Sequence, residues 1–245
     1  MEIQTKLKED SLAPRFGTWW EKIRPFWASG GFDPVYSFLR GQSQAGKQIA
    51  PASMHTYRAF TETQFDNLQC VIVCQDPYFK FVNGSPIASG VAMDCSITAR
   101  VQPTLQNFYF GIETELFNGL NLSYVQEHDL SFLSSQGVLL LNAALTVEKD
   151  KPNSHMDIWE PFTKFLLQEV ISSTGVPVLF LGKEASRFEL LLAGTNPTYT
   201  LSHPASSAYT GKPWETEGVF TQINKRIWDS NKDTILWLPM GDPPF

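Results

Sequence analysis

Short apolar runs alternate with amphipathic segments along most of the chain. Four runs have the length of a strand and are largely apolar: Cys70–Cys74, 138–141, 176–181 and Thr198–Leu201. Apolar strands separated by helices are typical of a parallel sheet that is covered on both faces. The pattern therefore predicts one α/β domain with a central four-stranded, mostly parallel sheet flanked by helices on both faces.

The segments between these runs have helical periodicity. Around position 165, for example, Phe162, Phe165, Leu166 and Val170 share one face of a helix. Helices are expected at 19–26, 32–39, 104–116, 159–172, 185–192 and 219–228, with a short amphipathic stretch at 54–60, a polar loop at 42–53, and a short strand or irregular chain at 235–238. The predicted division is an N-terminal tail (1–16), the folded domain (17–238) and a C-terminal tail (239–245).

Composition and charge exclude several classes of protein. The 245 residues carry a net charge of -6, which excludes binding driven by a global basic field. No apolar run approaches the ~20 residues of a membrane helix, and the first ten residues contain no apolar signal region. We therefore expect an intracellular, soluble protein, in either cytoplasm or nucleus. Three cysteines and four scattered histidines form no metal-binding motif, so no metal and no cofactor are expected.

Polar side chains follow each of the four apolar runs. Asp76 and Tyr78 follow the first, Asn142 ends the second, Lys183 follows the third and His203 the fourth. The carboxyl ends of parallel strands line one crevice, so we expect these residues to converge. An amide can read the edge of a pyrimidine, a carboxylate can stabilise a cation or position a water, and a neutral imidazole can donate to an oxyanion.

These residues stand in stretches that resemble the motifs of uracil-DNA glycosylases. Residues 71–78 (VIVCQDPY) are similar to the family's water-activating motif, 137–146 (GVLLLNAALT) to its uracil-reading strand, and 203–206 (HPAS) to its DNA-intercalation motif. Order and spacing hold from about Trp20 to about Trp237. The resemblance implies a monomeric hydrolase that releases uracil from a flipped nucleotide in DNA, for base excision repair or viral DNA maintenance, without metal or cofactor.

The resemblance also implies roles for individual residues. Asp76 is expected to stabilise the sugar cation and orient the water, and His203 to hydrogen-bond the uracil oxygen as the base leaves. Tyr78 is expected to exclude the 5-methyl group of thymine, and Asn142 to read uracil and reject cytosine. The backbone at Gln75, directly after Cys74, is expected to donate to the base.

Stacking on the base and gripping of the DNA are assigned in the same way. Met93 aligns with the aromatic residue that stacks on uracil in the family, and Phe81 and Ile87 are the alternatives. Few phosphates need to be gripped, so short loops suffice for DNA binding. The expected DNA-binding residues are Thr104, Lys183, Ser206 and Ser207.

Two departures from the family pattern affect these expectations. Phe79 follows the DPY sequence where the family usually has His, and no Leu follows His203-Pro204; Ser207, Ala208 or Tyr209 takes its place. A member without an apolar wedge is expected to prefer single-stranded DNA, because unpairing and unstacking in a duplex cost a few kcal/mol. Together with the HPA sequence, which resembles the poxviral branch, these departures indicate a divergent member of viral or phage type.

Other interpretations stay open at this point. One is a catalytically weak or inactive scaffold of the same fold that binds DNA or a polymerase; the other is a glycosylase for a different damaged pyrimidine, which would need a pocket opened at Tyr78. His155 either braces a loop or serves as a spare base. Protein partners of the kind expected are a polymerase factor or an inhibitor.

Overall fold

A four-stranded parallel sheet forms the centre of the computed structural model, which describes residues 9–117 and 124–239 of the 245. In spatial order its strands are β5 (Val138–Asn142), β2 (Cys70–Cys74), β7 (Val178–Leu181) and β8 (Thr198–Leu201). Cys74 pairs with Asn142 and Leu181 with Leu201, so the carboxyl ends of all four strands lie at one edge. The predicted α/β class and parallel sheet are thereby confirmed.

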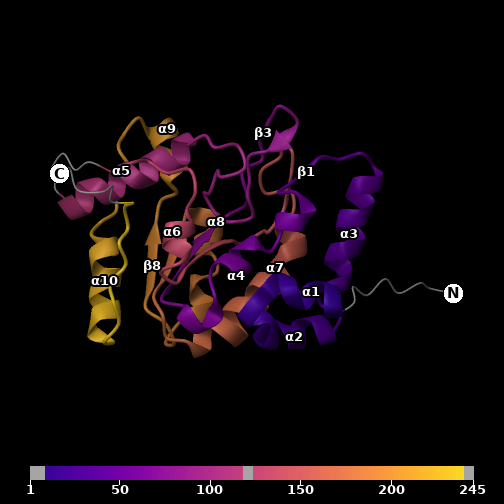
Figure 1. The fold of residues 1–245 in the computed structure, drawn as a ribbon, viewed down its shortest axis with the longest axis horizontal. Coiled ribbons are helices and arrows are strands. Elements are labelled where there is room, and N and C mark those ends of the chain that lie inside the picture. The colour runs from indigo at the N-terminus through magenta and orange to yellow at the C-terminus, as the bar shows by residue number, and fades with distance from the viewer. Residues whose placement is uncertain (1–8, 118–123, 240–245) are drawn as a thin grey trace.

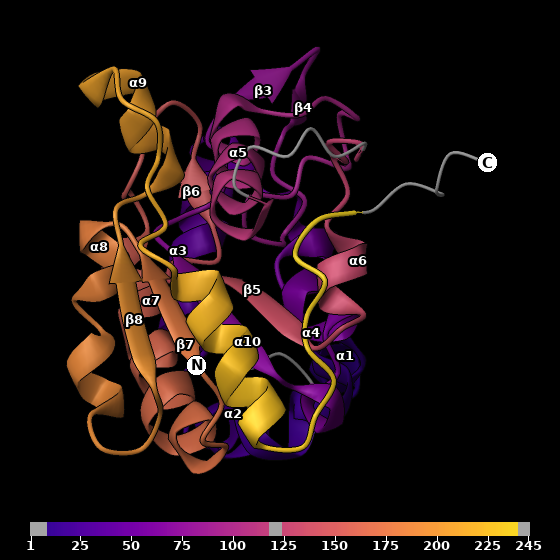
Figure 2. The ribbon, with the colours of Figure 1, turned by 90° about the vertical axis from the view of Figure 1, so that its left-hand side faces the viewer.

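Helices cover both faces of this sheet. Figure 1 shows α10 on one side of the sheet and α7, with α1, α2 and α3 beyond it, on the other. In Figure 2, α10 lies in front of β7 and β5, and β8 points upward beside it, toward α9. The α-helices are α1 (Glu9–Phe16), α2 (Trp20–Ala28), α3 (Asp33–Gln44), α4 (Arg58–Glu62), α5 (Pro103–Phe117), α6 (Ser131–Ser134), α7 (Met156–Phe165), α8 (Lys183–Ser186), α9 (Ser207–Thr210) and α10 (Val219–Asp229).

Two pairs of very short strands lie outside the central sheet. β1 (Ile49–Ala50) pairs with β6 (Val147–Glu148), and β3 (Phe81–Val82) pairs with β4 (Ser85–Pro86), both antiparallel. The first pair joins the chain before α4 to the chain after β5, and the second forms a hairpin directly after the first predicted motif. Both pairs therefore build the rim around the carboxyl edge of the sheet.

Residues 9–16 differ from the predicted N-terminal tail. They form helix α1, in which Leu12 and Phe16, four positions apart, are both buried. The Phe16 ring packs against Tyr57 and Phe60, with ring centres 4.5 and 5.2 Å apart. Burial of this apolar stripe stabilises a helix that contains Pro14 and has weak local signals.

Several predicted boundaries also change. The helix expected at 159–172 begins at Met156 and continues through a π-helical stretch (Leu166–Val170) into a 3-10 turn (Ile171–Ser173). The helix expected at 185–192 is interrupted: α8 ends at Ser186, and a 3-10 helix follows (Glu189–Leu192). Residues 235–238 are irregular. The predicted C-terminal tail lies, except for its first residue, outside the described residues.

In the described part of the chain, no helix combines the length and the apolar character that crossing a membrane requires.

Candidate active site

A pocket of about 460 Å³ opens at the carboxyl edge of the sheet. It is lined by the last residues of β2, β5 and β7 and by the loop after β8, so the predicted convergence is observed. The lining residues are Cys74, Gln75, Asp76, Pro77, Tyr78, Phe79, Met93, Thr104, Asn142, Pro152, Leu181, Gly182, Lys183, Glu184, His203, Ala205 and Tyr209.

Asp76 is held in the pocket by a residue that sequence reasoning did not select. The backbone N–H of Asn153 donates to Oδ2 of Asp76 over 2.5 Å. Burial raises the pKa of the Asp76 carboxyl above its usual value, although the hydrogen bonds from Asn153 and Gln75 oppose this shift. A carboxylate that is partly stripped of water yet fixed by a backbone donor suits electrostatic stabilisation of a nearby cation.

Asn142 ends β5 with its side chain in the pocket. Only 4% of the residue is exposed, and its Oδ1 has no hydrogen-bond partner within the described part of the chain. If the amide oxygen and nitrogen exchanged places, Nδ2 would be buried without an acceptor at the same position. Either orientation of the Asn142 amide therefore leaves a polar atom without a hydrogen-bond partner there. Buried polar atoms are normally paired, so an unpaired amide atom in a residue that lines the pocket makes Asn142 a candidate for binding a polar group.

His203 is a neutral hydrogen-bond donor in this structure. Burial lowers its pKa from 6.5 to about 4. Its Nδ1 accepts a hydrogen bond of 3.2 Å from the backbone N–H of Ala205, so the ring proton resides on Nε2. A neutral imidazole that is locked in this tautomer can donate to an oxygen that becomes negative during a reaction.

Gly182 permits the close approach of β7 to His203. Its φ is +88°, a conformation that L side chains rarely adopt, and a Cβ built on it would lie 3.0 Å from Cβ of His203. The Gly182 N–H also donates to the Leu201 carbonyl over 2.8 Å, which ties the ends of β7 and β8 together. Glycine at this position therefore sets where the imidazole lies.

Tyr78 and Met93 form one wall of the pocket and contact each other. The Tyr78 hydroxyl donates to the Met93 carbonyl over 3.3 Å. Burial raises the pKa of Tyr78 well above 10, so the phenol stays protonated. Met93 is buried and has a φ of +64°, which is unusual for a residue with a side chain.

The predicted DNA-binding residues fall into two groups. Thr104, at the start of α5, and Lys183, in the first turn of α8, line the pocket. Ser206 and Ser207 stand beside it, where α9 begins, but are not lining residues. Tyr209 on α9 does line the pocket and is 90% exposed, so its ring stands free at the rim.

His155 lies outside the pocket in a buried hydrogen-bonded group. Its Nδ1 is 2.9 Å from Oγ1 of Thr146, which also accepts from Nε1 of Trp159 over 2.7 Å. Burial lowers the His155 pKa to about 4. The residue thus braces the loop that carries Asn153, which matches the first of the two interpretations of the sequence.

Some of the residues around Asp76 and His203 could not be selected from the sequence. Asn153 acts through its backbone, and its side chain type carries no information about that bond. Gly182 follows the third apolar run, but the sequence does not show that it lies against His203. Among the described residues, no group of three or more His, Cys, Asp or Glu side chains is arranged to hold a metal ion, and all three cysteines are free and buried.

Curated proteins that match this chain over most of its length are uracil-DNA glycosylases. The chain is 32% identical over 222 residues to a uracil-DNA glycosylase of Francisella philomiragia, covering 89% of this chain and 95% of the relative. It is 32% identical over 225 residues to that of Pseudomonas aeruginosa, covering 90% and 93%. No family model matches the chain.

Solved structures show the same fold at lower identity. Mimivirus uracil-DNA glycosylase superposes with a TM-score of 0.78 at 19% identity, covering 97% of this chain and 89% of that one. A variant of the mimivirus protein in complex with UGI superposes with a TM-score of 0.79 at 21% identity, covering 95% and 91%.

Proposed function

Because the chain belongs to the uracil-DNA glycosylase family, we propose that it hydrolyses the N-glycosidic bond of deoxyuridine in DNA, releasing free uracil and leaving an abasic site. The enzyme is accordingly a glycosylase and a hydrolase. The observation that carries the reaction is the meeting of Asp76, Asn142 and His203 in one pocket: an acid, an amide with an unpaired oxygen and a neutral imidazole.

Cleavage of this bond leaves positive charge on the sugar and negative charge on the base. Asp76, as a carboxylate, stabilises the sugar cation and orients the attacking water; the bond from Asn153 keeps its second oxygen in place. His203 donates from Nε2 to the uracil oxygen that gains charge as the base leaves. A neutral imidazole with its proton on Nε2 is suited to this, because that hydrogen bond strengthens as negative charge builds up on the oxygen.

Recognition of uracil uses the other walls of the pocket. The Asn142 amide donates to one uracil carbonyl and accepts from the ring N–H, a pattern that cytosine does not present. The Tyr78 ring occupies the space that the 5-methyl group of thymine would need, and Met93 contacts the face of the base. The backbone at Gln75 lies at the same carboxyl edge and donates to the base.

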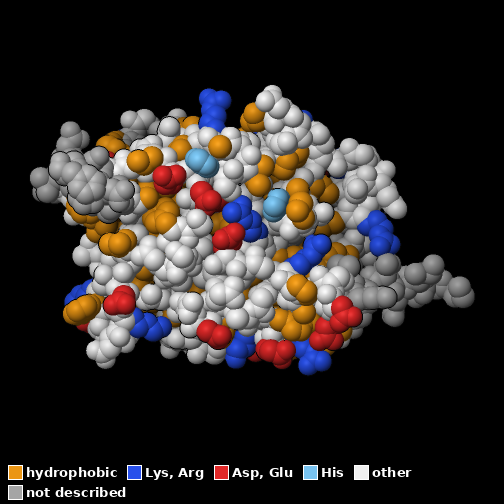
Figure 3. Space-filling model, viewed as in Figure 1, with side chains coloured by type: hydrophobic (Ala, Val, Ile, Leu, Met, Phe, Trp, Pro, Cys, Tyr) orange, Lys and Arg blue, Asp and Glu red, His pale blue; other side chains and the backbone are white. Residues whose placement is uncertain are grey.

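DNA is held at the rim. Thr104, Lys183, Ser206 and Ser207 contact phosphates, and the free Tyr209 ring fills the gap that the flipped nucleotide leaves. On the face in Figure 3, Lys and Arg side chains lie singly or beside Asp and Glu instead of forming one block. Binding by a few local contacts fits such a surface and the net charge of -6.

A protein inhibitor is the protein partner that we propose for this enzyme. A variant of the mimivirus neighbour, whose fold this chain shares over 95% of its length, is in complex with UGI. We expect UGI to bind at the pocket rim of this protein and to block uracil release. Such inhibition would also indicate that the rim has the same shape as in the mimivirus protein.

The direct test is release of free base from DNA oligonucleotides that contain one uracil, single-stranded or paired, incubated with the purified protein. We expect free uracil and an alkali-sensitive abasic site from both substrates, and no product from matched oligonucleotides with thymine or cytosine. Binding of the uracil oligonucleotide without release of uracil would favour the non-catalytic scaffold instead.

A further inference from the structure

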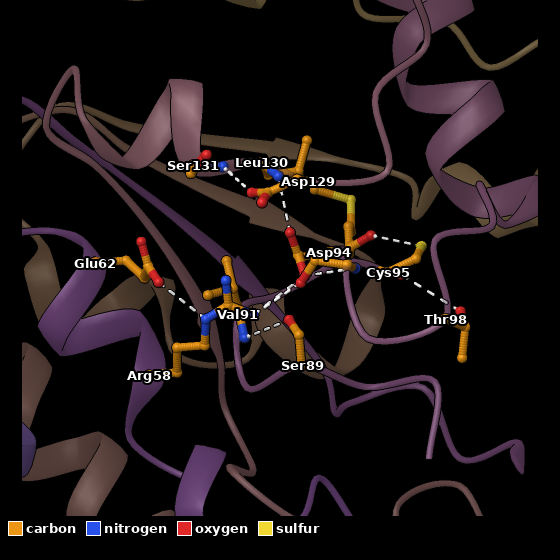
Figure 4. Close-up of polar contacts among 12 residues, drawn as sticks. Arg58, Glu62, Ser89, Val91, Asp94, Cys95, Thr98, Asp129, Leu130 and Ser131 are labelled. Carbon is orange, nitrogen blue, oxygen red and sulfur yellow. Dashed lines mark hydrogen bonds and ion pairs between the residues drawn. The ribbon is translucent and has the colours of Figure 1, made fainter. Parts of the chain in front are cut away.

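A buried carboxylate lies directly behind the wall that Met93 forms. The Asp94 side chain is 1% exposed. Its Oδ2 accepts from the backbone N–H of Leu130 over 2.8 Å (Figure 4). Its Oδ1 accepts from the N–H and the hydroxyl of Ser96 over 3.0 and 2.6 Å. The Arg58 guanidinium stands 3.8 Å from the same Oδ1. Asp94 thus joins three segments that are far apart in the sequence.

The residue before Asp94 needs such support. The Asp94 N–H donates to the Val91 carbonyl over 3.3 Å, which closes a four-residue turn with Met93 at its third position. Met93 has a φ of +64° there, where turns with a positive φ favour Gly or Asn. A residue with a long side chain persists in this conformation only when its surroundings hold it.

Arg58 is itself held close to this turn. A Cβ built on Gly90 would lie 1.8 Å from the His55 carbonyl oxygen and 3.1 Å from Cβ of Arg58, so only glycine allows the chain before the turn to pack this closely against the segment that leads into α4. From α4, Arg58 donates to the Ser96 hydroxyl over 2.8 Å and pairs with Glu62 over 2.9 Å. The guanidinium therefore offsets the charge of Asp94 inside the protein.

The turn controls two walls of the pocket at once. The Met93 side chain lines the pocket, and the Met93 carbonyl accepts the hydrogen bond from the Tyr78 hydroxyl. The Ala92 N–H donates to the Leu140 carbonyl over 3.1 Å, which anchors the other end of the turn to β5 beside Asn142. A small rotation of the Met93 peptide would consequently move both the surface under the base and the ring beside its C5 position.

We propose that Asp94 is a positioning residue for base recognition: with Arg58 and Ser96 it holds the turn at 91–94 so that Met93 contacts the flipped uracil and Tyr78 stays against its C5 edge. The inference rests on the proposed function, because it assigns a cause to the shape of that pocket. Asp94 is not one of the residues that line the pocket, so its effect passes through Met93.

The test substitutes Asp94→Asn and measures inhibition by free uracil, the product, which occupies the base pocket without DNA. The amide keeps the size of the carboxylate but faces the Leu130 and Ser96 donors with one acceptor fewer. We expect the inhibition constant of uracil to rise about tenfold, the effect of losing one charge-assisted hydrogen bond. Affinity for an abasic-site oligonucleotide, which leaves the base pocket empty, should stay within about twofold.

Two further variants separate positioning from stability. Asp129→Asn is the matched control, because Asp129 neighbours Leu130 but bonds only the Ser131 N–H among the described contacts; it should leave uracil inhibition unchanged. Ser96→Ala removes one donor to Asp94 and should weaken uracil inhibition by about threefold even if Asp94→Asn fails to fold. All assays are run where circular dichroism shows the variant folded.

A double-mutant cycle provides the decisive readout. In a Met93→Ala background, Asp94→Asn should change uracil inhibition clearly less than it does alone, because the side chain under the base is gone and only the contact of Tyr78 with the carbonyl of residue 93 is left to disturb. An undiminished effect in that background overturns the proposal, and so does wild-type uracil inhibition in Asp94→Asn and Ser96→Ala. If the wild-type protein releases no uracil, both the proposed function and the role of Asp94 are wrong. If the wild type is active and the variants show the same uracil inhibition, only the role of Asp94 is wrong.

Discussion

The backbone N–H of Asn153 donates to Oδ2 of Asp76 over 2.5 Å, although 77 positions separate the two residues. Asn153 has a φ of +66°, which Asn tolerates better than most residues. The loop that carries it is fixed on both sides: the Ser154 hydroxyl accepts from the Glu148 N–H, and His155 bonds Thr146. The acid at the end of β2 is therefore aimed by the loop between β6 and α7.

Asp76→Asn is expected to lower the turnover of uracil release by about 10²–10⁴-fold, because the amide cannot stabilise the sugar cation. The bond from Asn153 can persist, since the amide oxygen still accepts. Single-turnover release of uracil under saturating enzyme measures the loss. Near-wild-type release by this variant would contradict the role of Asp76.

The same substitution is expected to stabilise the protein at neutral pH. Burial raises the pKa of Asp76 above 3.8, so the folded state holds that proton more tightly than the unfolded chain. Stability from protonated Asp76 is present below pH 3.8 and is lost as the pH rises through the raised pKa. Thermal unfolding at pH 7 should thus occur at a higher temperature in Asp76→Asn, and the difference should shrink at pH 4. A variant less stable than wild type at pH 7 would contradict this.

The two buried histidines should make stability fall on mild acidification. Burial lowers the pKa values of His155 and His203 from 6.5 to about 4. Between these two pH values the unfolded chain protonates both side chains, whereas the folded protein keeps them neutral. The stability that these two neutral histidines contribute is fully present above pH 6.5 and is lost as the pH falls toward about 4. Urea unfolding at pH 7 and pH 5 measures the decrease, and His155→Asn should remove about half of it. An unchanged decrease in that variant would exclude His155 as a source.

Asn142→Asp is expected to relax the choice between uracil and cytosine. A carboxylate cannot donate to the uracil carbonyl, but it can accept from the cytosine amino group. Oligonucleotides containing cytosine should then yield detectable free cytosine, and uracil release should fall. Asn231→Asp, an exposed residue after α10, is the matched control and should change neither rate. Unchanged uracil release without cytosine release would count against Asn142 as the reading residue.

Gly182→Ala is expected to lower turnover about tenfold, because its Cβ would press on Cβ of His203 at 3.0 Å and displace the imidazole. Gly175→Ala is a close control: Gly175 also has a positive φ, but a Cβ there meets nothing within 4 Å. Both variants should lose stability through backbone strain, and only the first should lose turnover. Equal turnover losses would mean that strain alone is responsible.

Tyr209→Ala is expected to lower release from duplex DNA about tenfold more than release from single strands, since only a duplex requires the gap to be filled. Trp228→Ala, on α10, is the control, because Trp228 is an exposed aromatic residue that does not line the pocket. Equal effects on both substrates would show that Tyr209 is no wedge. The preference for single strands predicted from the absent Leu would then stand.

The amino-acid pattern was sufficient for the sheet and for the residues at its carboxyl edge. The runs that became β2, β5, β7 and β8 are recognisable because a strand that is buried on both faces must be apolar along its length. Asp76, Asn142 and His203 directly follow or end such strands, so one topological rule brought them together. Helix α1 was not predicted, because its apolar stripe consists of only Leu12 and Phe16 and a proline, Pro14, stands between them.

Only the tertiary structure decided how these residues are held. The order of the strands, the bond from Asn153 to Asp76, the approach of Gly182 to His203 and the attachment of Asp94 to Leu130 all join positions that are distant in the sequence. Local pattern reports whether a residue prefers a strand, a helix or the interior. Which backbone donor faces a given carboxylate depends instead on how separate elements pack, and that is set by the whole chain at once.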